Sequence, residues 1–248
     1  MLGIIGAGNM AGALARGWGE PVLATDRGSG RAARLVADIG GEVVASNAEL
    51  VRRADTIILG HHPHQLEEIA GEVDASGKQV FSVLAPTTMA QLKQAYPNST
   101  VARIMPNTPV QLRMGVSCIA EGGEAAVPLF ERVGKVFVLP ESQMNLGTAT
   151  IGVTPAYIAL LIEAMVDAAA VNGLAPKLGQ AMFVQTLIGT AHLIAEKGYD
   201  TLAARREVAT PGESTVRGVA ALERCGIRPM FQEAMADVLT RLSQPYHG

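Results

Sequence analysis

A glycine-rich turn close to the N-terminus has residue types and spacing suited to binding a dinucleotide. Gly6, Gly8 and Ala11 fit the pattern G-x-G-x-x-G/A, directly after a short apolar run. Gly6 permits a tight turn, Gly8 lets the backbone approach a pyrophosphate, and Ala11 allows close packing of a helix on a strand. The N–H groups at the start of that helix attract phosphate charge. We therefore predict that Gly6, Gly8, Asn9 and Met10 bind a nicotinamide dinucleotide.

The residues after the second expected strand bear on the choice between NAD and NADP. Asp26 is placed to hydrogen-bond ribose hydroxyls, which favours NAD. Arg27, Ser29 and Arg31 form a short basic loop with a hydroxyl group, which suits a 2′-phosphate. We expect NADP(H) to be favoured over NAD(H), with Asp26, Arg27 and Ser29 at the cofactor.

Short apolar runs and helical patterns alternate over residues 1–146 and predict the scaffold that holds this turn. Strands are expected at Leu2–Ile5, Val22–Ala24, Val43–Ala45, Thr56–Leu59, Gln79–Val83, Val101–Met105, Val116–Ala120 and Lys135–Leu139. Helices are expected at Asn9–Trp18, Arg31–Ile39, Asn47–Arg53, Leu66–Ala70, Thr88–Ala95 and Glu124–Val133. This alternation is typical of the α/β class and predicts a Rossmann-type, doubly wound parallel sheet as the N-terminal domain.

The pattern changes after Met144, and residues 147–248 are expected to form an all-α C-terminal domain. Its predicted helices are Pro155–Asn172, Pro176–Lys197, Glu213–Arg224 and Pro229–Leu242. These segments contain more Ala, Leu, Ile and Met than a small bundle can bury. We therefore expect part of their surface to form the interface of a homodimer or a higher homo-oligomer.

Composition argues against several other classes of protein. Lys and Arg number 20 and Asp and Glu 23, so the net charge of −3 gives no electrostatic reason to expect nucleic acid or an anionic membrane as partner. No run of 18 uninterrupted apolar residues occurs, so a soluble protein is expected. Two cysteines cannot supply a disulfide framework, and a cytoplasmic location fits. The histidines of His61–His64 have no carboxylate or cysteine nearby to complete a metal site.

Several segments, in order along nearly the whole chain, resemble the pyrroline-5-carboxylate reductase family. They are Gly6–Gly12 (G-A-G-N-M), Arg103–Pro109 (R-x-M-P-N-T-P), Pro155–Tyr157 with Ile162–Ala164 (P-A-Y and E-A), and Val208–Thr215 (S-P-G-G-x-T). The resemblance implies NAD(P)H binding by the first domain and dimerisation by the second. It also implies reduction of the C=N bond of a cyclic imine, 1-pyrroline-5-carboxylate, to L-proline, and hence a role in proline biosynthesis.

The same resemblance implies roles for individual residues. Asn47 would contact the adenosine, His62 and Pro63 stand where the family has Lys-Pro beside the cofactor, and Ala85 and Asn107 would lie near the nicotinamide. The substrate carboxylate and imine nitrogen would be bound by Thr210, Gly212, Glu213, Ser214 and Thr215. The Thr215 hydroxyl would act in catalysis, because the imine nitrogen needs a hydrogen-bond donor or proton relay while hydride is transferred.

The substrate segment also has the residue types of a helix start. Thr210 is a candidate N-cap, Pro211 suits the first helical position, and Glu213 completes a capping box. The cap and carboxylate binding are compatible, because one helix start has several free N–H groups.

Four positions depart from the family pattern around the expected pocket. Glu213 replaces a glycine, Val153 a hydroxyl residue in the loop 150–154, Pro86 a glycine and His62 a lysine. A carboxylate at 213 would repel a substrate carboxylate, unless Arg217 draws it away as an i,i+4 pair.

These departures leave other functions open. The alternatives are reduction of a different cyclic imine and the role of a non-catalytic nucleotide-binding relative. A dehydrogenase of the 3-hydroxyacid type shares the two-domain plan but needs a helix-borne lysine as proton donor. Lys177 and Lys197, the lysines of the helical part, do not sit where that lysine is expected.

Overall fold

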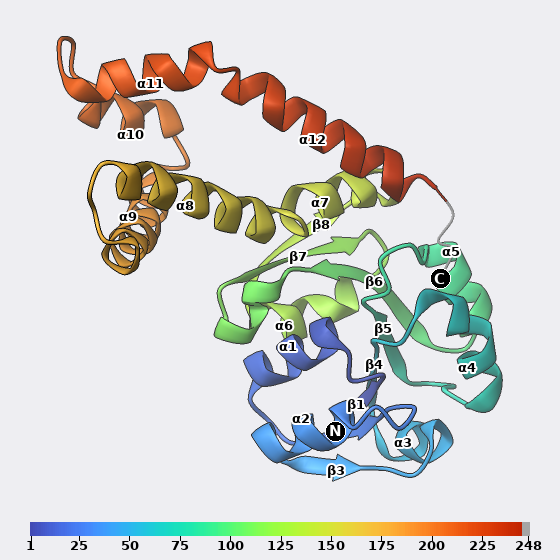
Figure 1. Cartoon of the computed structure of the whole chain (residues 1–248). Coiled ribbons are helices and arrows are strands. Elements are labelled where there is room, and N and C mark those ends of the chain that lie inside the picture. Colours follow the sequence, from blue (N-terminus) through green and yellow to red (C-terminus); the bar gives the residue numbers. More distant parts are fainter. Residues whose placement is uncertain (245–248) are drawn as a thin grey trace. The chain divides into compact units, whose positions relative to one another are not determined.

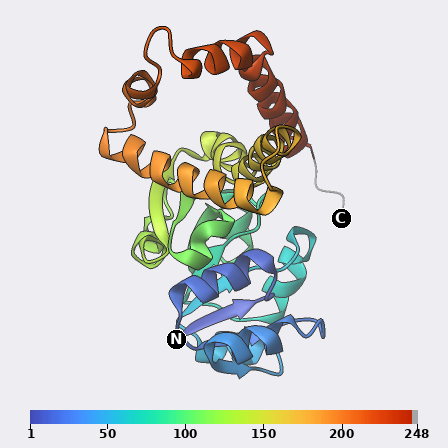
Figure 2. The same cartoon turned by 60° about the vertical axis from the view of Figure 1, so that its left-hand side comes forward.

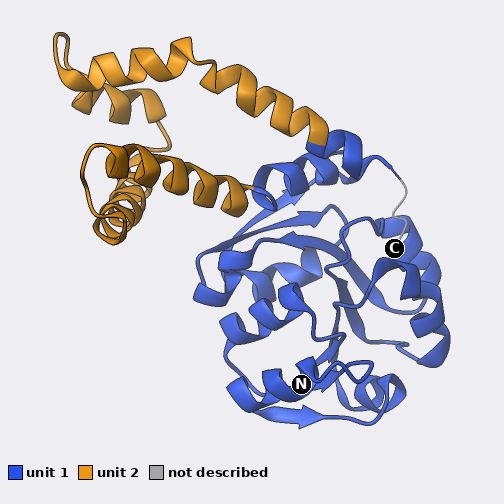
Figure 3. Cartoon of the chain, viewed as in Figure 1, with its two compact units in different colours: residues 1–153, 238–248 blue, residues 154–237 orange. Residues whose placement is uncertain are grey.

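The computed structural model describes residues 1–244, which divide between two compact units (Figure 3). The first unit is Met1–Val153 together with the C-terminal segment that starts at Val238, and the second is Thr154–Asp237. The N-terminal unit contains the whole sheet, and the other unit contains helices.

Eight strands form one sheet in the first unit (Figure 1). They are β1 (Leu2–Ile5), β2 (Val22–Thr25), β3 (Gly41–Val43), β4 (Thr56–Leu59), β5 (Gln79–Ser82), β6 (Thr100–Pro106), β7 (Gly115–Ala120) and β8 (Gly134–Leu139). Their order is β3-β2-β1-β4-β5-β6-β7-β8, and all neighbours from β3 to β6 pair in parallel. The chain reverses its winding direction between β1 and β4, and a crevice for a ligand forms at such a switch point.

Helices cover both faces of this sheet (Figures 1 and 2). One face carries α1 (Asn9–Trp18), α2 (Arg31–Ile39) and α6 (Val127–Glu131). The other carries α3 (Asn47–Arg53), α4 (Leu66–Glu72), α5 (Met89–Ala95) and α7 (Met144–Ile151). Successive side chains of a strand point to opposite faces, so β1 buries Ile4 in one core and Ile5 in the other.

The predicted Rossmann-type sheet with a helical region after it is confirmed, with local differences. The strand expected at Val43–Ala45 lies at Gly41–Val43, because those residues pair in register with Val22–Ala24. The last two strands extend the sheet, but β7 runs antiparallel to β6 and β8 runs parallel to β7. The expected helix Glu124–Val133 consists of a 3-10 turn, Glu124–Ala126, followed by α6.

The second unit consists of α8 (Thr154–Val171), α9 (Pro176–Glu196), α10 (Thr201–Val208), α11 (Ser214–Arg224) and the first part of α12 (Ile227–Leu242). Helices α8 and α9 pack on each other, yet α8 has no buried residue and α9 buries only Gly179. Leu160, Met182 and Ile188 are among the large apolar side chains exposed there. Within the part of the chain described, this unit therefore leaves an extensive apolar surface uncovered.

Two α-helices of residues 1–244 were not anticipated, α7 and α10, and the first of them affects the limits of the domains. Helix α7 packs against β6 and β7, so residues 147–153 stay with the sheet and the compact units divide after Val153 rather than after residue 146. Thr150 and Ile151, expected in a loop, are the last residues of α7. The short helix α10 has a low apolar content, which hides it from a pattern search, and the Asp200 carboxylate caps its first turn.

Candidate active site

The glycine turn lies between β1 and α1, at the switch point of the sheet. Gly6 has φ 87°, and a Cβ at this position would meet the His61 backbone nitrogen at 2.6 Å. Gly8 is the N-cap residue of α1 and has no capping side chain, so no side chain at the N-cap occupies the first N–H groups of the helix. Only glycine fits at position 6, and the helix start presents its amides to an anion.

A third glycine, Gly60, completes this turn, and the sequence reasoning missed it. It follows β4, which lies beside β1. A Cβ on Gly60 would lie 2.5 Å from the Ala11 Cβ and 2.6 Å from the Gly6 carbonyl oxygen. Its position directly after the fourth expected strand could have indicated this role, because parallel strands end at the same edge of the sheet.

A groove of about 400 Å³ begins at this turn. It brings together residues from three strand ends and from the C-terminal segment of the first unit: Gly8, Asn9, Met10, Gly60, His61, Pro63, Val83, Leu84, Ala85, Pro86, Arg241, Leu242 and Gln244. The predicted Gly8, Asn9, Met10, Pro63 and Ala85 all line it. The uncapped helix start, the glycines that keep the turn open and the volume of the groove fit a dinucleotide.

Asp26 is bound by its own loop. Its carboxylate accepts hydrogen bonds from the Gly28 N–H at 2.8 Å, the Ser29 hydroxyl at 3.0 Å and the Ala32 N–H at 2.8 Å. The bond from the Ala32 N–H, followed by those from Ser29 and Gly28, holds the pKa of this carboxyl below its ordinary value despite slight burial. Asp26 therefore caps the start of α2 and shapes the loop.

Of the basic residues beside this loop, Arg27 forms an ion pair, whereas Arg31 and Arg34 form none with the described residues. The Arg27 guanidinium pairs with Glu68 at 2.8 Å, and both side chains are more than half exposed. Arg31 and Arg34 line a hollow of about 380 Å³ between α1 and α2, together with Gly8 and Asn9. Among the described residues neither has an ion-pair partner, so both guanidiniums are available to an anion. Arg34 was not predicted, although its spacing of three residues from Arg31 places it on the same helix face.

Asn47 and His62 lie near the groove but are engaged with other residues. The Asn47 amide oxygen accepts from the Thr25 hydroxyl at 2.7 Å, and its amide nitrogen donates to Glu72 at 2.9 Å. His62 is exposed, and its ring stacks on His64 with centroids 5.7 Å apart.

The neighbouring histidine, His61, is the one that lines the groove. Its Nδ1 lies 2.8 Å from the His62 carbonyl oxygen, and its Nε2 is buried without a partner among the described residues. Burial lowers its pKa, which favours the neutral ring.

Asn107 is buried and holds the fold together at the end of β6. Its amide oxygen accepts from the Val116 N–H at 2.8 Å, and its amide nitrogen donates to the Ile151 carbonyl at 3.3 Å. The side chain thus joins β7 and the end of α7. It is not among the residues found to line the groove.

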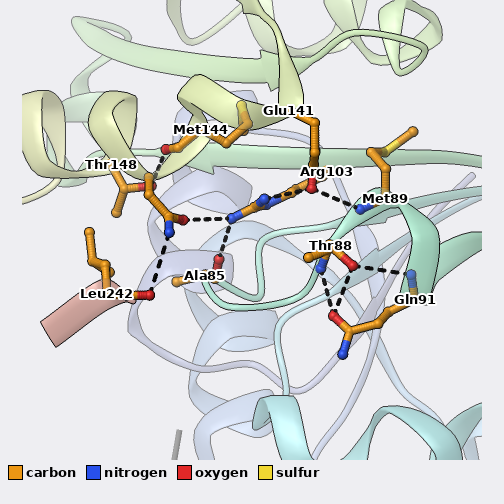
Figure 4. A network of polar contacts seen from close by, with 10 residues as sticks. Ala85, Thr88, Met89, Gln91, Arg103, Glu141, Met144, Thr148 and Leu242 are labelled. Atoms are coloured by element: carbon orange, nitrogen blue, oxygen red, sulfur yellow. Dashed lines mark hydrogen bonds and ion pairs between the residues drawn. The ribbon is translucent and has the colours of Figure 1, made fainter. Parts of the chain in front are cut away.

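A buried arginine lies beside the groove at the predicted nicotinamide end (Figure 4). The side chain of Arg103, on β6, is 4% exposed. Its guanidinium donates to Glu141 at 2.7 Å, to the Ala85 carbonyl at 3.0 Å and to the Asn145 amide oxygen at 3.2 Å. The sequence reasoning used Arg103 only as part of a motif and gave it no role, although an arginine inside a central strand calls for a buried partner.

The predicted substrate residues lie in the second unit, around the start of α11. This helix begins at Ser214, with Glu213 as its N-cap residue and no capping side chain. The expected cap at Thr210 is therefore wrong: Thr210 instead accepts a hydrogen bond from the Glu213 N–H through its carbonyl oxygen, at 3.1 Å. Gly212 has φ 90° in this turn, which moves the helix start beyond Pro211.

The side chains of this segment are accessible. Thr210, Gly212, Glu213 and Ser214 are exposed, and Thr215 is half-buried. Within residues 1–244, Glu213 and Arg217 do not form the i,i+4 ion pair considered above. The helix start thus offers free N–H groups and three hydroxyl side chains, with one unpaired carboxylate among them.

No group of three or more histidine, cysteine, aspartate or glutamate side chains suited to a metal ion occurs in the described part of the chain.

Two family profiles match the chain, one over its N-terminal part and one over its C-terminal part. The family profile "Pyrroline-5-carboxylate reductase dimerisation" matches residues 141–244, and the profile "NADP oxidoreductase coenzyme F420-dependent" matches residues 1–86. The chain is 32% identical over 250 residues to a pyrroline-5-carboxylate reductase of Synechocystis sp., covering 94% of both proteins.

Solved structures agree over nearly the full length. A pyrroline-5-carboxylate reductase from Coxiella burnetii superimposes with a TM-score of 0.86 at 25% identity, covering 98% of both chains. A Plasmodium falciparum pyrroline carboxylate reductase with NADP bound gives 0.84 at 22% identity, covering 97% of this chain and 96% of that chain.

The dimerisation profile also bears on the apolar helices. By length and composition alone, Glu141–Val171 and Pro176–Glu196 are long and apolar enough to cross a membrane, and few of their residues are buried. Both segments fall within the match to the dimerisation profile. The exposed apolar side chains therefore lie in a part of the chain that is similar to a dimerisation domain.

Proposed function

The chain belongs to the pyrroline-5-carboxylate reductase family, and from this premise we propose that it reduces 1-pyrroline-5-carboxylate to L-proline with NADPH as the hydride donor. The observation that carries the proposal is the match over nearly the entire length to reductases of this name, together with a groove at the switch point that fits a dinucleotide. The protein is accordingly an oxidoreductase that acts on CH–NH bonds and serves proline biosynthesis.

The residues of the first unit would bind and orient the cofactor, which supplies the hydride. Gly6, Gly8 and Gly60 keep the turn open, and the N–H groups of Asn9 and Met10 face the pyrophosphate. His61, Pro63 and Ala85 line the remainder of the groove. We assign the nicotinamide to the Ala85 end, whose loop follows β5. Asn47 and His62 would contribute at the edges of the site, and Asn107 would support it from beneath through its contacts with Val116 and Ile151.

The preference for NADPH over NADH rests on the loop after β2. The Asp26 carboxylate already accepts three hydrogen bonds, so it is not poised to accept from ribose hydroxyls. Arg31 and Arg34 lie beside the glycine turn without ion-pair partners in the described residues, and two guanidiniums suit a 2′-phosphate. Arg27 and Ser29 border the same loop.

The start of α11 would bind the imino acid. Its free N–H groups, with the hydroxyls of Thr210 and Ser214, suit the substrate carboxylate. The Thr215 hydroxyl would donate a hydrogen bond to the imine nitrogen, where electron density accumulates as hydride adds to the carbon. A weak donor is sufficient, because the iminium form is accessible near neutral pH.

One observation favours a second substrate class within the same chemistry. Glu213 is exposed and unpaired in the described residues, at the N-cap of the helix that would receive the carboxylate. Two unit charges about 4 Å apart repel by about 1 kcal/mol in water and about 4 kcal/mol at an effective dielectric constant near 20. A cyclic imine without a carboxylate would avoid this repulsion, and Glu213 would then attract the iminium cation.

The family assignment supports a homo-oligomer formed through the C-terminal helices. We propose a homodimer as the smallest unit, since α8 and α9 leave apolar side chains exposed on one chain. We also propose that the protein works in the cytoplasm.

The test follows NADPH oxidation at 340 nm with 1-pyrroline-5-carboxylate and, in parallel, with 1-pyrroline, which lacks the carboxylate. The proposal expects proline as the product and a higher kcat/KM for the carboxylate substrate. A clear preference for 1-pyrroline would move the function to the second class. If Glu213→Gly reverses that preference, Glu213 is the cause.

A further inference from the structure

The loop between β5 and α5 contributes one wall of the cofactor groove, and a hydrogen bond from the Thr87 N–H to the Leu84 carbonyl at 3.0 Å closes it around Ala85 and Pro86. Ala85 and Pro86 both line the groove. Because proline has no N–H, the only hydrogen-bonding group of the Ala85–Pro86 peptide is the Ala85 carbonyl. Thr88 at the far end of the loop is fixed separately, by a reciprocal pair of hydrogen bonds with Gln91.

The Arg103 side chain holds that carbonyl. Its Nη2 donates to the Ala85 oxygen at 3.0 Å and to the Asn145 amide oxygen at 3.2 Å (Figure 4). Nη1 donates to Glu141 Oε1 at 2.7 Å. The Arg103 side chain is 4% exposed, so most of its hydrogen-bonding capacity depends on these protein partners.

The partners of Arg103 connect the loop to four other segments of the first unit. Glu141 Oε1 also accepts from the Met89 N–H at 3.2 Å, at the first residue of α5. Asn145, on α7, donates to the Leu242 carbonyl at 3.4 Å, at the last residue of α12. Arg103 thus lies at the centre of a network that joins β6, the Ala85 loop, α5, α7 and the C-terminal segment.

Two polar atoms of this network have no hydrogen-bond partner among residues 1–244. Arg103 Nε and Glu141 Oε2 are both buried without a partner within the described residues. A stabilising ion pair would use both carboxylate oxygens in a two-point contact, yet this arginine divides its donors among Glu141, Asn145 and the Ala85 carbonyl. Arg103 therefore contacts several segments of the chain instead of forming the strongest possible ion pair with Glu141.

We propose that Arg103 is a positioning residue for hydride transfer: it fixes the Ala85–Pro86 peptide against the nicotinamide end of the groove. The hydride part of this inference rests on the proposed function, and the positioning of the loop does not. Hydride transfer requires the donor and acceptor carbons within about 3–3.5 Å, and a displacement of about 1 Å lowers the rate by about 100-fold. The Ala85–Pro86 peptide has one hydrogen-bonding group, so its position is sensitive to the loss of the Arg103 donor on that carbonyl.

The test compares Arg103→Met and Arg103→Lys with Arg113→Met as control. Arg113 also donates to a backbone carbonyl in the first unit, that of Gly17 at 2.7 Å, but it lies outside the groove. Arg103→Met is expected to raise the Kd or KM for NADPH, or lower kcat, by at least about tenfold, and to increase the primary isotope effect with deuterated NADPH. Arg103→Lys should recover part of the loss, and Arg113→Met should match the wild type.

A second variant loosens the same peptide and leaves the buried ion pair intact. Pro86→Ala, which removes the fixed φ of proline, should reproduce the kinetic change with a Tm close to that of the wild type, and it should add less than about threefold to the defect of Arg103→Met. Amide hydrogen exchange should increase over residues 84–88 in both variants, with NADPH bound and no imine present.

The outcomes separate positioning from a purely structural role. If Arg103→Met lowers only the Tm, and NADPH affinity, isotope effect and exchange at 84–88 stay within twofold of the wild type, the proposal is wrong. If that variant does not fold, wild-type behaviour of both Arg103→Lys and Pro86→Ala refutes it equally. A wild-type protein that binds NADPH but does not reduce 1-pyrroline-5-carboxylate contradicts the proposed function, while binding and exchange still decide the positioning claim.

Discussion

Replacing Gly60 with alanine adds one methyl group at the most crowded point of the cofactor turn. The new Cβ would lie 2.5 Å from the Ala11 Cβ and 2.6 Å from the Gly6 carbonyl oxygen. Neither neighbour is the end of a flexible side chain, so the turn and the first residues of α1 must move by about 1 Å to restore ordinary van der Waals contact. Such overpacking costs about 1–3 kcal/mol, which corresponds to a Tm lower by about 2–12 °C in a protein of this size.

The displacement also moves the α1 amides away from the pyrophosphate. Loss of one hydrogen bond to a charged group costs about 1.5–3 kcal/mol, so the Kd for NADPH should rise by about 10- to 150-fold. Fluorescence titration with NADPH measures this change, and differential scanning fluorimetry measures the Tm. The reasoning is refuted if Gly60→Ala binds NADPH within threefold of the wild type.

Gly71→Ala is the matched control for the added methyl group. Gly71 lies in α4, is exposed, and has nothing within 4 Å of a Cβ position. Alanine is more stable than glycine inside a helix by about 0.5–1 kcal/mol, so this variant should bind NADPH normally and unfold at the same or a higher temperature. A similar loss of affinity in both variants would show that the effect does not come from the cofactor turn.

Three further predictions follow from the site. Thr215→Ala should lower kcat by about 10- to 100-fold with the Kd for NADPH unchanged, and undiminished turnover would remove Thr215 from the mechanism. Changing Arg31 and Arg34 together to alanine should raise the KM for NADPH at least about tenfold and leave the KM for NADH within twofold; equal effects on both would contradict a 2′-phosphate site. Burial lowers the pKa of His61 below the ordinary value near 6.5. As the pH falls, this histidine therefore takes up a proton in the unfolded chain before it does so in the folded protein. The free energy of unfolding should consequently decrease below about pH 6.5. His61→Val should therefore lose less Tm than the wild type between about pH 7.5 and 5.5, and parallel losses would show that His61 is not responsible.

The sheet was predictable because each strand is a short apolar run and each crossover helix has a clear start. Helix α1 begins and ends at the expected residues, Asn9 and Trp18, since glycines bound it on both sides. Helix α7 was missed, because its apolar sequence lies between two other apolar segments and its packing on β7 determines where it belongs. Which residues form a compact unit depends on such tertiary contacts rather than on composition.

The cofactor turn was predictable from glycine spacing, while the contacts around it were not. Gly60 lies beside the turn because β4 pairs with β1, and Arg103 lies beside the Ala85 loop because β6 pairs with β5. The hydrogen bonds that Asp26 accepts from Ser29 and Ala32 could not be foreseen from residue types, because they depend on how the loop folds back on the start of α2. The helix start at Thr210 was misjudged because its residue types fit a capping box, whereas the turn through Gly212 delays the helix to Ser214.

The central claim is that this chain transfers hydride from NADPH to a cyclic imino acid. Its most direct test is a single incubation of the purified protein with NADPH deuterated at C4 and 1-pyrroline-5-carboxylate, followed by mass spectrometry of the product. We predict L-proline that carries one deuterium at C5, formed in a one-to-one ratio with NADP. Binding of NADPH without deuterated proline, at enzyme concentrations equal to that of the substrate, would contradict the account.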